Sequence, residues 1–329
     1  MKTYQTTNYA SYGKNTTLRL KNLNSDFSPT FKDVILNTPK PVVMSGGLFN
    51  DLFYFEEGLG QDLVKEGHDV WEIELTGGPQ IECPTCPNYI YQDLADYYWP
   101  VLIAGVMDYS NKNQVNYIGH SNGCRVALSS LNSYSNGKNN AGYVFNTQTG
   151  LYDTLVDLPQ RPVDKFFGIA CPATLNDENL YTTIARSKDV TAPLKLGEYA
   201  INKTAGKKHI FLKDYARYFS PITLYFDNDA AMSRNVMKFY NTLAINNDSV
   251  FDVSNINVSK LYLFNGYDSD FIVPFNDQPR ILNSSNLDSQ NEQGIPYTTN
   301  ILSLEFVNHV SIKNNPKVKN DVKDRLKGD

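Results

Sequence analysis

The chain has few histidines and cysteines, and it lacks any long apolar run. Its 329 residues include only four of each, so imidazole or thiol chemistry has few candidate side chains. No stretch approaches the roughly 20 apolar residues that span a bilayer, and the polar start of the chain has no apolar segment typical of a signal peptide. We therefore expect no transmembrane segment. A cytoplasmic location and secretion with the signal peptide already removed both stay open.

The chain also lacks an excess of positive charge. Its formal net charge is −5, and 20% of its residues are charged, which argues against a broad nucleic-acid-binding surface. With 41% hydrophobic residues, the chain can bury the core of one large domain or two small ones. Nothing in this composition predicts the oligomeric state.

The cysteines give little support for a metal site. Cys83 and Cys86 form a lone C-x-x-C pair in a polar loop, and this is only half of a zinc site. A local disulfide, free thiols and, less favoured, a bound metal stay open for this pair. Cys124 and Cys171 are expected to be buried side chains that act as small apolar groups. We expect no metal and no cofactor.

The most informative motif is Gly119-His120-Ser121-Asn122-Gly123. It lies between a β-branched and aromatic run at 115–118 and a helix-compatible run at 124–131. A serine on a sharp turn between a strand and a helix adopts strained backbone angles, and the flanking glycines remove Cβ atoms that would clash. Such a turn exposes the serine hydroxyl and directs the first helix amides toward a forming oxyanion.

Two further segments support a functional reading of this motif. Residues 258–274 read VSKLYLFNGYDSDFIVP, a strand followed by a glycine, two aspartates and Val273-Pro274. Residues 41–78 contain a buried strand, Ser45-Gly46-Gly47 and a second strand at 69–75. Between them an amphipathic helix is expected, with Leu52, Phe55, Leu59 and Leu63 at helical spacing and an end near Gly67. With these segments the chain resembles the α/β-hydrolase superfamily, in its lipase and esterase branch.

This resemblance implies a nucleophile, an acid and a histidine, in that order along the chain. Ser121 matches the nucleophile. Among the histidines, His68 and His120 do not follow a suitable acid, and His209 lies in a Lys-rich stretch before any suitable acid. His309, which follows the strand-like run at 301–307, therefore matches the base.

The acid is assigned from the segment after the strand at 260–265. The family commonly has the form G-x-x-D-x-x-V-P, whereas this chain carries one extra residue between Gly266 and Val273-Pro274. Counting back from Val273-Pro274 selects Asp270, and Asp268 is the fallback. The resemblance thus implies a Ser121, Asp270 and His309 triad.

The same resemblance implies an oxyanion hole made of backbone amides. The matching donors are the N–H of Asn122 and that of Gly47 or Leu48, where Ser45-Gly46 replaces the usual His-Gly. Phe49 and His120 are predicted to line the substrate pocket.

Strands and helices alternate along the chain, which predicts a mostly parallel central sheet with helices on both faces. The resemblance implies that this sheet is the core of an α/β-hydrolase fold. We expect an antiparallel edge from strands at 17–23 and 34–37, a helix at 90–109 interrupted at Pro100, and a hairpin or loop at 133–162. Residues 1–174 and 258–329 form the predicted core, ending in a charged surface helix or tail.

The 175–257 stretch is too long for a loop and is predicted to be an inserted subdomain. The resemblance implies that this subdomain is a cap or lid over the serine. It is rich in aromatic residues, and it includes an expected helix with Met232 and Leu243 on its apolar face.

The expected activity is that of a serine hydrolase that cleaves carboxylic esters of small molecules or lipids through an acyl-enzyme. Two alternatives stay open. A thioesterase or amidase would use the same triad, and a catalytically silent α/β-hydrolase would use the fold for binding.

Overall fold

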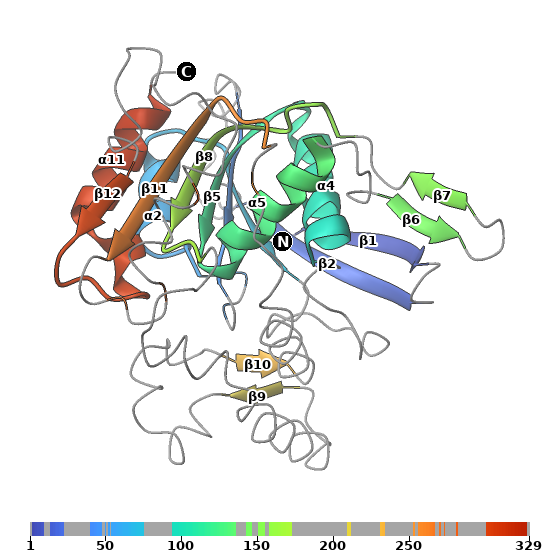
Figure 1. Ribbon diagram of the computed structural model, residues 1–329, viewed down its shortest axis with the longest axis horizontal. Coiled ribbons are helices and arrows are strands. Elements are labelled where there is room, and N and C mark those ends of the chain that lie inside the picture. The colour runs from blue at the N-terminus through green and yellow to red at the C-terminus, as the bar shows by residue number, and fades with distance from the viewer. Residues whose placement is uncertain are drawn as a thin grey trace.

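The computed structural model describes residues 2–9, 14–22, 40–47, 50, 52, 54–75, 94–135, 143–146, 151–154, 158–172, 209–211, 231–233, 253, 256–266, 270, 273, 281 and 301–327. Among these residues, the largest sheet has eight strands in the order β1-β2-β4-β3-β5-β8-β11-β12 (Figure 1). Their bounds are β1 Lys2–Tyr9, β2 Lys14–Asn22, β3 Val42–Ser45, β4 Val70–Glu74, β5 Val115–His120, β8 Val163–Ile169, β11 Lys260–Gly266 and β12 Ile301–Leu304.

The sheet is parallel from β4 to β12 and antiparallel at its other edge. Strands β4, β3, β5, β8, β11 and β12 pair in parallel, while β2 pairs antiparallel with β4 and β1 antiparallel with β2. The mostly parallel sheet is therefore confirmed, and so is an antiparallel strand near 17–23. The sequence did not predict β1, and the strand expected at 34–37 lies outside the described residues.

The central strands are buried on both faces, and alternate residues serve two apolar cores. Val42 and Met44 of β3 pack in one cluster, and Val43 between them packs in the other. This follows from the two-residue period of a strand. Two-sided burial explains why these strands read as continuous apolar runs.

Helices cover both faces of the sheet, as predicted. Helices α4 (Trp99–Ser110) and α5 (Asn122–Ser135) lie over one face, and α2 (Leu59–Lys65) and α11 (Pro316–Leu326) lie over the other. In Figure 1, α4 and α5 lie to the right of the central strands, and α11 lies to their left.

Three helix predictions need refinement. Helix α2 starts only at Leu59, because Gly58 has φ +89° and ends the preceding turns. Pro100 does not interrupt its helix. It lies in the first turn of α4, directly after the π-helical turn η3 (Leu94–Tyr98), where its missing N–H costs little. Helix α11 is more than a charged surface helix, since it buries three apolar side chains: Val318, Val322 and Leu326.

Two small hairpins lie away from the central sheet in Figure 1. Strands β6 (Tyr143–Asn146) and β7 (Leu151–Thr154) form the hairpin expected within 133–162. Strands β9 (His209–Phe211) and β10 (Ala231–Ser233) pair within the predicted cap. Met232 therefore lies in a strand rather than in the helix expected there.

Most of 175–257 lies outside the described residues, so the cap boundary stays a prediction. None of the helices in the described part of the chain is long and apolar enough to cross a membrane.

Candidate active site

Ser121 lies at the turn between β5 and α5, with the backbone geometry that the motif predicts. Its φ is +52°, in the left-handed region that non-glycine residues rarely adopt. Its N–H donates to the Ile169 carbonyl at 2.9 Å, and its carbonyl accepts from the N–H groups of Cys124 and Arg125 at 3.0 and 3.1 Å. The conformation is therefore held by bonds to the neighbouring strand and to the first helical turn.

The turn leaves no space for side chains at its two glycines. A Cβ at Gly119 would lie 2.6 Å from the Cα of Cys124, and one at Gly123 would lie 2.4 Å from the Gly46 carbonyl oxygen. The Tyr117 hydroxyl donates to the Gly123 carbonyl at 2.9 Å. Burial raises the pKa of Tyr117, so the hydroxyl keeps its proton and fixes the first turn of α5.

His309 and Asp270 meet at the carboxyl ends of neighbouring strands. The Nδ1 atom of His309 lies 3.0 Å from Oδ2 of Asp270, and both side chains are almost fully buried. The other Asp270 oxygen accepts the N–H of Val273 at 3.0 Å. A Cβ at Gly266 would lie 2.3 Å from the Val307 carbonyl oxygen and 3.1 Å from the Asp270 Cβ. Glycine at this position therefore allows the two loops to approach.

The segment that carries His309 is itself capped. The Asn308 side-chain oxygen accepts the N–H groups of Val310 and Ser311 at 3.1 and 2.8 Å, and the Asn308 N–H donates to the Ser311 hydroxyl at 3.2 Å. These bonds form a turn that leads through Val310 into the short 3₁₀ helix Ser311–Asn314. The backbone on both sides of His309 is therefore held.

The loop after β3 lies against Ser121. A Cβ at Gly47 would lie 2.8 Å from the Ser121 Cβ. The N–H of Gly47 donates to Oδ1 of Asn50 at 2.8 Å, so this amide already has an acceptor. Asn122, the first residue of α5, is 5% exposed. Leu48 and Phe49 lie outside the described residues, as does Asp268.

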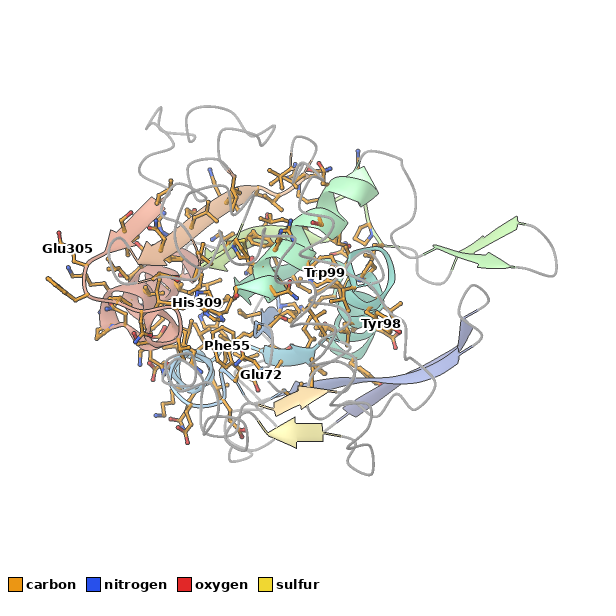
Figure 2. The ribbon with its side chains drawn as sticks, turned by 60° about the horizontal axis from the view of Figure 1, so that its bottom comes forward. Phe55, Glu72, Tyr98, Trp99, Glu305 and His309 are labelled. Atoms are coloured by element: carbon orange, nitrogen blue, oxygen red, sulfur yellow. A yellow bond between two sulfur atoms is a disulfide. The ribbon has the colours of Figure 1, made fainter. Side chains whose placement is uncertain are left out.

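His120 is the last residue of β5. Its ring lies beside that of His309, with the two centroids 4.8 Å apart. It is 2% exposed, and its Nε2 atom lies 2.7 Å from the His309 carbonyl oxygen. In the view of Figure 2, the labels of His309 and Phe55 lie to the left of Trp99, which is the first residue of α4. Phe55 and Trp99 belong to the two opposite cores. The pocket role assigned to His120 stays a prediction.

Cys124 and Cys171 are joined by a disulfide, which corrects the expectation that they act only as small apolar side chains. Both are fully buried, as expected, and their Cα atoms lie 5.4 Å apart across 47 residues of sequence. The bond forms because the first turns of α5 pass over the end of β8. Cys83 and Cys86 lie outside the described residues.

Three residues that the sequence analysis missed hold this region together: Tyr117, Asn308 and Asn50. Asn50 and Asn308 gave local signals, because asparagine favours turns in which its side chain bonds to backbone a few residues away. Within the described ranges, no group of three or more His, Cys, Asp or Glu side chains could hold a metal ion.

No protein-family model matches the sequence, and no curated protein matches it significantly. Similar solved structures do exist. A thermophilic esterase from Thermogutta terrifontis has a TM-score of 0.57 and 12% identity, with 100% of this chain and 99% of that chain covered. An esterase from Exiguobacterium antarcticum has a TM-score of 0.56 and 16% identity, with 98% and 100% covered.

A third similar structure is itself an α/β-hydrolase. An α/β-hydrolase enzyme from a Medee basin deep-sea metagenome has a TM-score of 0.54 and 12% identity, with 95% of each chain covered. The parallel sheet with its helical layers therefore places this protein among the α/β proteins. More particularly, it has the α/β-hydrolase fold, as the resemblance predicted.

Proposed function

We propose that the protein is a serine hydrolase that cleaves carboxylic esters, with Ser121, His309 and Asp270 as its catalytic triad. The observation that carries this proposal is the 3.0 Å contact between His309 Nδ1 and Asp270 Oδ2. It lies at the same end of the sheet as the strained turn of Ser121. A strained serine, a histidine and a buried carboxylate are the parts that acyl transfer through a nucleophilic hydroxyl requires.

In the proposed reaction, the Ser121 hydroxyl attacks the ester carbonyl and His309 Nε2 accepts the hydroxyl proton. Asp270 accepts the hydrogen bond of His309 Nδ1–H, which holds the ring in the required tautomer and stabilises the imidazolium. The tetrahedral intermediate collapses to an acyl-enzyme as His309 returns the proton to the leaving alcohol. A water molecule, deprotonated by His309, then attacks the acyl-enzyme. The bond to Ser121 breaks, the acid is released, and His309 returns the proton to the Ser121 oxygen.

The oxyanion would be bound by backbone amides. The N–H of Asn122 is the first proposed donor, because Asn122 begins α5 directly after Ser121. Of the two candidates for the second donor, Leu48 is favoured, since the Gly47 N–H is already bonded to Asn50. Gly47 would serve only if the Asn50 side chain moved away.

The proposed substrate is a small-molecule or lipid ester. Two of the similar structures are esterases, and this agrees with the chemistry that the three residues support. We further propose that 175–257 forms a cap over Ser121, and that Phe49 lies in the acyl pocket beneath it.

The test compares the wild-type protein with Ser121→Ala on p-nitrophenyl esters of increasing chain length. Ser121→Ala should lower turnover by roughly a hundred-thousandfold or more and should prevent labelling by an organophosphonate. Its fold should be retained, because alanine adds no bulk at the turn. Residual turnover above a few per cent of wild type removes Ser121 from the mechanism.

The same assay separates the alternatives. Faster cleavage of a matched sulfur ester or amide than of the oxygen ester would favour a thioesterase or amidase. A protein that neither turns over esters nor reacts with the organophosphonate would be a binding protein. For a closed apolar pocket, each buried methylene contributes about 0.8 kcal/mol, so kcat/KM should rise roughly three- to fourfold per CH₂ until the pocket is full. A flat profile would argue against the cap.

A further inference from the structure

His120 connects the strand that carries the proposed nucleophile to the backbone of the proposed base. It directly precedes Ser121, and its Nε2 atom lies 2.7 Å from the His309 carbonyl oxygen. The two imidazole rings have centroids 4.8 Å apart. A carbonyl oxygen only accepts hydrogen bonds, so His120 must carry its proton on Nε2 and donate it. This contact spans 189 residues of sequence.

The surroundings of His120 keep its ring neutral. Burial is the main reason that its pKa lies well below the ordinary value of 6.5, and electrostatic repulsion from the neighbouring His309 and Lys313 lowers it further. The bond to the His309 carbonyl acts in the opposite direction but does not outweigh them. A neutral imidazole has one N–H, and here that N–H is already used, so His120 cannot itself exchange protons with a substrate.

The remaining nitrogen of His120 is not used by the described part of the protein. Nδ1 is buried and has no hydrogen-bond partner there. The Tyr54 ring packs against the imidazole with centroids 5.0 Å apart, and a Cβ at Gly47 would lie 3.2 Å from Nδ1. The ring is therefore enclosed between Tyr54 and the loop of Gly47, so its orientation is fixed by packing as well as by one hydrogen bond.

We propose that His120 is a positioning residue, which sets the separation between Ser121 and His309 by holding the His309 carbonyl from the strand that ends at the serine. The kinetic consequence rests on the proposed function. His309 would then be held through three independent contacts: its ring by Asp270, its carbonyl by His120, and the following backbone by the cap of Asn308. Of these three contacts, only the one with His120 connects His309 to β5, the strand that ends directly before Ser121.

This role differs from simply satisfying a buried carbonyl. Loss of one neutral hydrogen bond in a core lowers stability, and by itself it leaves the chemistry of a folded site unchanged. Loss of a contact that sets the distance between nucleophile and base lowers kcat, since a displacement of about 1 Å can cost roughly a hundredfold in rate. The two roles therefore separate when kcat, KM and stability are measured on the same variants.

The experiment compares His120→Leu with His120→Gln. Leucine removes the donor at similar volume, whereas glutamine can place an amide N–H near the position of Nε2. We expect His120→Leu to lower kcat by roughly ten- to a hundredfold, with KM within about twofold of wild type, and His120→Gln to recover most of kcat. The control is Ser130→Ala, a fully buried change in α5, which should leave kcat unchanged.

Two outcomes of the kinetic comparison overturn the proposal. One is a folded His120→Leu protein with wild-type kcat. The other is a folded His120→Gln protein that is no more active than His120→Leu, because the donor would then be irrelevant and only the ring shape would matter.

A spectroscopic measurement on the wild-type protein needs no substrate and no variant that might not fold. Nitrogen-detected NMR of the isotope-labelled protein should show His120 as the neutral Nε2–H tautomer over the whole pH range in which the protein stays folded. The Nδ1–H tautomer, or a His120 ring that gains a proton before unfolding, overturns the proposal. If the tautomer is as expected but the wild type neither cleaves esters nor reacts with the organophosphonate, the proposed function fails while the His120 link stands.

Discussion

The two ends of the central sheet are built from different kinds of interaction. At the amino ends of the strands, charged groups are paired: Lys40 contacts Asp164 at 2.6 Å, and the Ser259 hydroxyl donates to the same carboxylate. Lys165 donates to the Arg325 carbonyl at 2.7 Å. At the carboxyl ends, Ser121 and Ala170 both have positive φ values, +52° and +47°, and His120 keeps a buried nitrogen without a partner among the described residues.

This difference shows at which end of the sheet the fold tolerates strained backbone angles. The contacts at the amino end pair charged groups and connect strands with a helix terminus, so they contribute to stability. The carboxyl end holds unfavourable backbone angles and buried ionisable side chains, which persist only where the surroundings hold them in place. Ligand sites in parallel α/β sheets lie at the carboxyl ends of the strands, and the features gathered at this end agree with that rule.

Among the changes that test this difference between the two ends, removing the charge of Asp270 should have the largest effect on activity, with little effect on the fold. Asp270→Asn should lower kcat by about 10⁴-fold, because a neutral amide cannot hold the His309 tautomer or stabilise the imidazolium. The amide oxygen can still accept the Val273 N–H, so the melting temperature should change little. Steady-state kinetics with thermal unfolding checks both expectations.

Asp268→Asn is the matched control for this prediction, and its effect on kcat should be far milder. If the two variants give the reverse order, the assignment of the acid by counting back from Val273-Pro274 is wrong.

Removal of the Cys124–Cys171 disulfide tests whether the carboxyl end of the sheet depends on a covalent link for its stability. Closing a loop of 47 residues should stabilise the folded state by about 4 kcal/mol through the entropy of the unfolded chain. The double variant Cys124→Ala/Cys171→Ala should therefore unfold at a clearly lower urea concentration than the oxidised protein. A loss below about 1 kcal/mol would mean that packing alone holds α5 against β8.

Asp164 should give the smallest effect, confined to stability. Its burial alone would raise its pKa, but hydrogen bonds from Lys40 and Ser259 and the charges of Lys40 and Lys165 outweigh burial and lower the pKa below 3.8. Because the folded-state pKa is depressed, the ionised carboxylate stabilises the fold above the ordinary pKa. This stabilisation is lost as the pH falls through the folded-state value.

Asp164→Asn should accordingly lower the free energy of unfolding by about 1–3 kcal/mol at neutral pH, with kcat unchanged. The gap between wild type and variant should close as the pH falls below 3.8. A gap that stays constant with pH, or a loss of kcat, would contradict the separation between the two ends.

The sequence predicted the inner strands well, and it failed where contacts are distant or local patterns are polar. Strands β3, β5 and β8 were found because two-sided burial requires apolar runs. Strand β1 was missed because KTYQTTNY has no such run. The start of α2 depends on the backbone of Gly58, whose φ of +89° no periodicity reveals.

The candidate site, too, could be predicted only where its residues lie in local sequence patterns. Ser121, Asp270 and His309 are recognisable because each follows a strand in a short segment, and the fold then brings Asp270 to His309. The Cys124–Cys171 disulfide and the His120–His309 contact join segments 47 and 189 residues apart. Neither contact leaves a local pattern, because both arise only when α5 and the loop after β12 pack onto the sheet.

Three glycines lie in the turn of Ser121 or pack against it, and this has a consequence for how substrate range can evolve. A side chain at Gly47, Gly119 or Gly123 would come within 2.8 Å of existing atoms, so natural selection has no side chain to vary there. Mutations at these positions would remove activity rather than redirect it. A directed-evolution library should keep the three glycines fixed and place its diversity on segments farther from the serine, where a new side chain has room.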